Sequence, residues 1–134
     1  MLFQIAHQRY AERHGLPKTL GDLEQHTVIG FDCSTSWIRA TTALGLQIRR
    51  EMFSLRCDSE LAQLSALRAG FGIGACHLHI AKRTPELVPV LPGLFHIDTE
   101  IWMAMHRDLR SVRRVALMFD YLAQKLEQQC VLNQ

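Results

Sequence analysis

The sequence lacks paired cysteines, an apolar run of membrane length and any recognisable leader. Its four cysteines stand far apart with no Cys-x-x-Cys pair: Cys33, Cys57, Cys76 and Cys130. This pattern is typical of free thiols in a reducing compartment rather than of a disulfide framework. No segment approaches the ~20 apolar residues that a membrane-spanning helix needs, and the start has no basic region of the kind that opens a signal peptide. We therefore expect a cytoplasmic protein that makes no contact with a membrane.

The sequence also lacks a large net charge. The sequence has 15 lysines and arginines against 13 acidic residues, a formal net charge of +2. A dedicated DNA-binding domain usually carries a concentrated basic face. The 134 residues are 48% hydrophobic and 21% charged, which is ordinary globular composition and enough for a real core. The sequence predicts one compact domain that does not itself contact DNA.

Predicted strands and helices alternate along the chain. The predicted strands are Leu2–Ala6, Thr27–Phe31, a hairpin of Trp37–Thr42 and Leu46–Leu55 around Gly45, a short strand after Gly74, Leu87–Leu91 and Ile97–His106. The predicted helices are Tyr10–His14, residues 61–69, Leu78–Lys82 and a long one from about Ser111. Gly15 before Pro17 is a usual helix ending, and Asp58-Ser59-Glu60 offers N-caps. This alternation favours a layered α/β fold.

Several segments together resemble one family in their order and spacing. Four of them are continuous: Tyr10–Pro17, Ala66–Ile73 with its Gly-x-Gly-Ile entry into a strand, Leu87–Pro92 and Arg114–Leu122. Between the first two, Phe31 stands at the family's strand position, Trp37 at its tryptophan strand and Gly45 at its hairpin turn. On these residues the chain resembles the effector-binding (substrate-binding) domain of LysR-type transcriptional regulators. Two places depart from the family pattern. Ala6-His7-Gln8 stands where Ala-Ser-Pro is frequent, and Cys76-His77 stands where Leu-Pro is frequent.

The resemblance implies a two-lobed α/β fold of the type II periplasmic-binding-protein kind, of which this chain would hold only a part. Residues 7–96 would form the second lobe, a mixed sheet flanked by helices. Residues 97–134 would supply the return strand and the C-terminal helix of the first lobe, with Leu2–Ala6 and Asp98–His106 crossing between lobes. The start of the first lobe and the winged helix-turn-helix of such regulators would lie outside this chain.

The candidate effector contacts are Ser34, Thr35 and Ser36, followed by Ser59 and Gly72. The three hydroxyl residues follow a buried strand, and ligands of open α/β sheets bind beyond strand ends. Hydroxyls and free backbone N–H groups there suit a small polar effector, such as a small carboxylate. Ser59 stands at a helix N-terminus, which favours anions but is also an ordinary N-cap position. Gly72 either lets the backbone approach a ligand or simply permits a turn.

Metal binding and catalysis have weaker support. Cys76, His77 and His79 have the right side chains for zinc, but no second ligand pair with zinc spacing exists, so we expect neither a metal nor another cofactor. Cys33 or Ser34 could act as a nucleophile only beside a positioned base, and neither Gly-x-Ser-x-Gly nor His-Glu-x-x-His occurs. The chain is therefore not expected to be an enzyme.

The function that the sequence favours is effector sensing. A small molecule would bind between lobes and shift a conformational equilibrium, which the parent regulator, expected to be a homo-oligomer, would transmit to its DNA-binding domain. A stand-alone solute-binding module is the alternative, and a metal-dependent enzyme is a more distant one.

Overall fold

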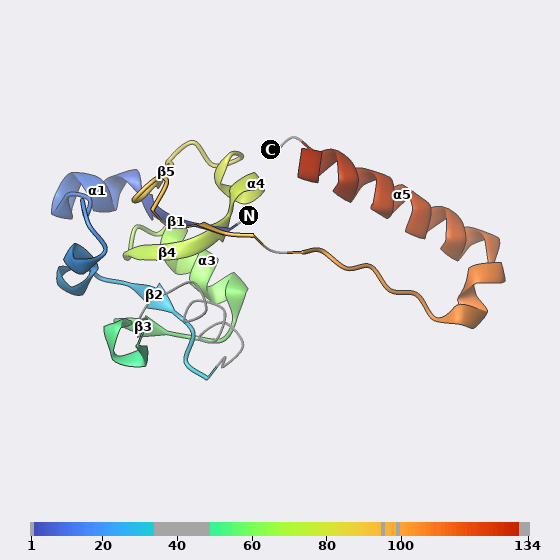
Figure 1. Cartoon of the computed structure of the whole chain (residues 1–134), viewed down its shortest axis with the longest axis horizontal. Coiled ribbons are helices and arrows are strands. Elements are labelled where there is room, and N and C mark those ends of the chain that lie inside the picture. The colour runs from blue at the N-terminus through green and yellow to red at the C-terminus, as the bar shows by residue number, and fades with distance from the viewer. Residues whose placement is uncertain (1, 34–48, 95, 99, 132–134) are drawn as a thin grey trace. The chain divides into compact units, whose positions relative to one another are not determined.

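The computed structural model describes residues 2–33, 49–94, 96–98 and 100–131. The chain divides into two compact units, Met1–Asp98 and Thr99–Gln134 (Figure 1). Within the described residues, no helix combines the length and the apolar character that crossing a membrane requires.

Strand β1 (Leu2–His7) is the centre of the first unit's sheet. β4 (Ile73–His77) pairs with one edge of β1 along nearly its whole length, and β5 (Leu87–Pro89) and β6 (His96–Ile97) share the other edge. All three pairings are antiparallel. The first strand of the chain thus joins three segments that lie far from it in the sequence (Figure 1).

Strands β2 (Ile29–Gly30) and β3 (Leu55–Arg56) extend the architecture beyond β4. They pair with each other in parallel, and a parallel bridge from Val28 to Ile73 joins β2 to β4. β2, β3 and β4 therefore run in the same direction. Their carboxyl ends point to the same edge as the start of β1, because β1 runs antiparallel to β4.

The α-helices that pack on the sheet in the described part of the first unit are α1 (Gln8–His14), α3 (Glu60–Arg68) and α4 (Leu78–Ala81). The sequence specifies their ends locally. His7 Nδ1 accepts a hydrogen bond from Arg9 N–H at 3.1 Å at the start of α1, and Gly15, with φ of 71°, ends that helix. Short 3₁₀ turns occupy Gly21–Gln25 and Arg50–Met52.

The core lies on both faces of the sheet. Because side chains alternate along a strand, the neighbours Ile5 and Ala6 of β1 belong to two different clusters. One cluster contains Ala6, Tyr10, Leu23, Val28, Phe53, Ile73, Val90 and Leu91. The other contains Ile5, Ile29, Leu67, Cys76, Ala81 and Leu87. Burial of one large side chain such as Leu67 contributes about 1.5–3 kcal/mol.

Most of the predicted elements are found, and two predictions are wrong. The predicted strand Leu46–Leu55 contains the 3₁₀ turn Arg50–Met52 instead, and pairing begins only at Leu55. The predicted strand Ile97–His106 is paired only at His96–Ile97. Alternating side chains cannot make a strand without a partner to pair with, and the pairing of Ile97 with Leu2 already reaches the first described residue of β1. Trp37–Thr42 and Gly45 lie outside the described residues.

The second unit consists of a stretch without regular structure, a 3₁₀ turn at Arg107–Ser111 and the long helix α5 (Arg113–Val131). The predicted apolar stripe is only half-buried at Val112, Val115 and Phe119, and Leu122 is 44% exposed. None of the described side chains of this unit is buried. The unit therefore has no core of its own.

We predict that the two units differ in hydrogen exchange. In monomeric protein, the amides of α5 should exchange at least about tenfold faster than those of β1 and β4, because no buried packing holds the helix. Exchange mass spectrometry at a concentration where sedimentation shows a monomer measures this difference. A monomer whose α5 amides are as slow as those of β1 would contradict the prediction.

Candidate ligand-binding site

A pocket of about 130 Å³ lies where the carboxyl ends of the parallel strands meet the first turns of α3. Its apolar lining comes from Leu2, Phe31, Leu61, Leu64, Ala75 and Ile80. Its polar lining comes from Glu60, Gln63, Cys76 and His77. Beyond the strand ends the backbone N–H and C=O groups no longer pair with a neighbouring strand and can contact a ligand. Open α/β sheets bind ligands at this edge.

The titratable groups of the pocket other than Glu60 are held in their neutral forms. Burial lowers the pKa of His77, as does the positive charge of the chain's amino terminus. His79, whose ring centroid lies 5.5 Å from that of His77, also has a pKa lowered chiefly by burial. Burial raises the pKa of the Cys76 thiol. At neutral pH the imidazoles and the thiol therefore offer dipoles rather than charges.

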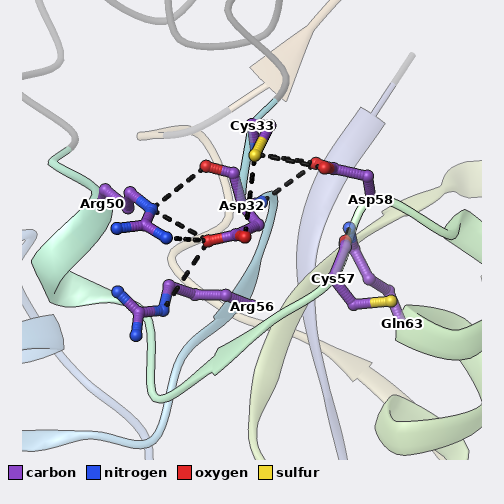
Figure 2. A network of polar contacts seen from close by, with 7 residues as sticks. All are labelled: Asp32, Cys33, Arg50, Arg56, Cys57, Asp58 and Gln63. Atoms are coloured by element: carbon purple, nitrogen blue, oxygen red, sulfur yellow. Dashed lines mark hydrogen bonds and ion pairs between the residues drawn. The ribbon is translucent and has the colours of Figure 1, made fainter.

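A polar network ties the ends of β2 and β3 together beside the pocket (Figure 2). The Asp32 carboxylate accepts hydrogen bonds from Arg50 Nε at 2.8 Å and from Arg50 Nη2, and Arg56 Nε lies 3.9 Å away. The hydrogen bond from Arg50 is the main reason that the pKa of Asp32 is lowered. Asp32 and Arg50 are both solvent-accessible, so the pair fixes geometry more than it adds stability.

Asp58 holds the backbone at the end of β2. Its Oδ1 accepts hydrogen bonds from the N–H groups of Asp32 and Cys33, both at 3.0 Å. The nearby charges of Asp32 and Asp58 raise the pKa of the Cys33 thiol. A thiol kept protonated in this way is a poor nucleophile, which argues against Cys33 as a catalytic residue.

Helix α3 is joined to the end of β3 by Gln63. This side chain is buried, and its Nε2 donates a hydrogen bond to the Cys57 carbonyl oxygen at 2.5 Å. Ser59 lies between them, and its N–H donates to Cys57 Sγ at 3.4 Å. The pocket wall formed by α3 is thereby attached to the strand ends that Asp32 and Asp58 connect.

The predicted contact residues occupy different settings. Ser59 Oγ accepts a hydrogen bond from Ala62 N–H at 3.4 Å, so the side chain caps α3. A Cβ on Gly72 would lie 2.3 Å from the Thr27 carbonyl oxygen, which accepts a hydrogen bond from Ile73 N–H at 2.9 Å. Gly72 therefore lets β4 approach this chain's own backbone. Ser34, Thr35 and Ser36 lie outside the described residues, although Asp32 and Cys33, the first two residues of that predicted loop, are described.

Sequence reasoning missed several residues of this site. Asp58 was expected only to cap a helix, whereas it also binds two backbone amides from β2's end. The sequence predicts Glu60 as a candidate N-cap and Leu61 and Leu64 as part of an apolar helix stripe, and predicts no role in a pocket for any of them. The signal that could have found them is position, because a helix that starts directly after a parallel strand begins at the ligand edge of the sheet. Among residues 2–33, 49–94, 96–98 and 100–131, no group of three His, Cys, Asp or Glu side chains is arranged to hold a metal.

Solved structures define the class of this fold. The chain is similar to the regulatory domain of CrgA, a LysR-type transcriptional regulator from Neisseria meningitidis, with a TM-score of 0.72 and 20% identity over 93% of this chain and 64% of that one. It matches whole CrgA with the same TM-score and identity over 44% of the longer chain. The regulatory domain of AphB from Vibrio vulnificus, treated with cumene hydroperoxide, matches at a TM-score of 0.52 and 17% identity over 68% of this chain and 48% of that one.

The family follows from the sequence. The model of the LysR substrate binding domain matches residues 2–127, and the chain belongs to this family. The fold is accordingly of the type II periplasmic-binding-protein kind, as the sequence predicted. The chain spans less than two thirds of the CrgA regulatory domain. No curated protein matched the sequence.

We predict that Gly72→Ala lowers the free energy of unfolding by about 1–3 kcal/mol, because the new methyl group would overlap the Thr27 carbonyl. Urea denaturation measures the change. Gly21→Ala is the matched control, since the nearest atom to its Cβ is Thr19 Oγ1 at 3.7 Å. Equal stability of the two variants would contradict the assigned packing role and favour a role of Gly72 in ligand contact alone.

We also predict that the protein is destabilised below neutral pH through His77 and His79. Their pKa values are lowered in the folded state, so below the ordinary value of 6.5 the unfolded chain binds more protons than the folded chain. The contribution to stability is present above pH 6.5 and is lost as the pH falls through the folded pKa values. The free energy of unfolding, measured by urea denaturation at pH 7.5 and at pH 5, should fall less between the two pH values for His77→Gln than for the control His14→Gln on α1. If the free energy of unfolding of His77→Gln falls between pH 7.5 and pH 5 as much as that of the control, this assignment is wrong.

Proposed function

We propose that this chain forms the greater part of the effector-sensing domain of a LysR-type transcriptional regulator, with the effector bound at the carboxyl ends of β2, β3 and β4. The observation that carries the proposal is a pocket beside α3 that is lined by Phe31, directly after β2, and by the last residues of β4, while β3 ends at the same edge of the sheet. Family membership over residues 2–127 supports the regulatory role. The relatives are regulator domains, which favours binding over catalysis.

The connections around the site give a physical route for signalling. A ligand that contacts Phe31, Glu60 and His77 touches the end of β2, the start of α3 and the end of β4 at once. The hydrogen bonds of Asp58 and Gln63 connect the end of β2, through residues 57 and 58 after β3, to α3, so a shift at the end of β2 is passed to α3. An effector that binds one arrangement more tightly than another changes their populations. The parent regulator would convert this change into altered DNA binding in the cytoplasm, where its promoter lies.

The second unit fits an interface rather than an isolated element. Trp102 is 84% exposed, and Leu117, Met118 and Tyr121 of α5 are each more than half exposed. Clustered apolar exposure of this kind marks a surface that another protein part covers. In our proposal, residues 7–96 are the second lobe, and residues 97–134 dock on a first lobe or on another copy in a homo-oligomer.

The test is a ligand screen on the chain itself. Binders found by thermal shift from a panel of small metabolites should perturb the amides of 31–33, 57–61 and 76–78 in NMR spectra and should be recovered chemically unchanged. In the full-length parent, Ser34→Ala, Thr35→Ala and Ser36→Ala combined should abolish the effector response and leave DNA affinity intact. Consumption of the ligand would favour an enzyme, and perturbations confined to other segments would overturn the proposed site.

A further inference from the structure

Resting on the proposed function, we propose that the effector is a small uncharged molecule with a compact apolar body and one hydroxyl group, a phenol or a short alcohol, rather than a carboxylate. The proposal follows from three properties of the pocket: its size, the sign of its charge and the polar atoms that line it.

The size of the pocket limits the effector to roughly one ring. Its volume is about 130 Å³. A protein cavity of about 150 Å³ lined by leucine, isoleucine and phenylalanine is known to take benzene. The walls here have the same character, since Phe31, Leu64 and Ile80 face the space. A ring or a branched chain of similar size removes this apolar surface from water when it binds.

The charge of the pocket disfavours an anion. Glu60 is the one charged side chain among the described lining residues, and it stands in the first turn of α3. Its carboxylate already complements the positive end of the helix, which would otherwise attract an anion. The nearby Arg50 guanidinium is hydrogen-bonded to Asp32, so it is already neutralised. Two positive charges also act on lining residues, Arg68 on Cys76 and the amino terminus on His77, but neither belongs to the described lining. Glu60 does line the pocket, so it repels a carboxylate ligand more directly than these charges attract it, and a neutral ligand meets no such repulsion.

The polar atoms of the pocket suit a hydroxyl group. The His77 imidazole lines the pocket and is half-buried, and its neutral ring has one nitrogen that donates and one that accepts. A hydroxyl can satisfy either nitrogen, because it both donates and accepts. A cation would have to leave water for a mainly apolar wall, with only the exposed Glu60 to compensate. These requirements together select an alcohol or a phenol.

The test compares phenol with benzoate and benzylamine, which carry the same ring. Saturation-transfer NMR titrations of the full chain at pH 9 give the dissociation constants, and this pH removes most of the charge of the amino terminus, whose ordinary pKa is about 7.7–8.0. We expect phenol to bind at least about tenfold more tightly than benzoate, given the strength of a charge repulsion near a protein surface. Tighter binding of benzoate or benzylamine at this site would overturn the assigned class and leave the proposed function standing.

Two pairs of variants localise the effect. Glu60→Gln should reduce the ratio of the benzoate to the phenol dissociation constant by at least about threefold, because it removes the repulsion and leaves the desolvation cost of the carboxylate in place, whereas Glu12→Gln on α1 should leave the ratio unchanged. Leu64→Trp should fill the pocket and abolish phenol binding, whereas Ala62→Trp on the exposed side of α3 should not. If no probe binds, or if phenol binds Leu64→Trp as tightly as the parent chain, the inference is wrong. The metabolite screen described above then decides separately whether the site binds another effector.

Discussion

The pairing of β1 on both of its edges is the constraint on which the rest of the structure depends. The six residues Leu2–His7 hold β4 on one side and β5 and β6 on the other. Because β1 stands at the start of the chain and its partners stand about 70 to 90 residues later, the sheet closes only when most of the first unit has folded. Side chains alternate between the two faces of the sheet along β1, so Ile5 packs in one core cluster and Ala6 in the other.

The direction of β1 places the candidate site. Since β4 runs antiparallel to β1 and parallel to β2 and β3, three carboxyl ends and one amino end meet at the same edge. Backbone groups beyond the strand ends are not paired within the sheet, so side chains can bind them and connect one element to the next. Asp58 binds the backbone at the end of β2, and Gln63 binds the backbone after β3. The elements at this edge are thus linked by side-chain-to-backbone hydrogen bonds as well as by apolar packing, and such bonds have defined geometry.

The site was only partly accessible from the sequence. The polar loop beginning at Asp32 and the cap at Ser59 were recognisable, because a strand end and a helix start have local residue signatures. The partnership of Asp58 with Asp32 was not recognisable, since nothing local connects residues 26 positions apart in the chain. Apolar pocket residues such as Leu64 were equally hidden. An apolar position on a helix looks the same whether it packs on a core or faces a cavity.

The sequence by itself determined the family, the α/β class, and the helices with local caps, because caps, glycine endings and apolar periodicity act over a few residues. Only the tertiary structure decided which predicted strands exist. Ile97–His106 has the side-chain pattern of a strand, yet only its first residue pairs, because a strand needs a partner to pair with. Tertiary structure also decided the role of Gly72, whose missing side chain makes room for the carbonyl of Thr27. Local patterns specify what a segment can form, and the neighbours that the fold brings to it decide what it does form.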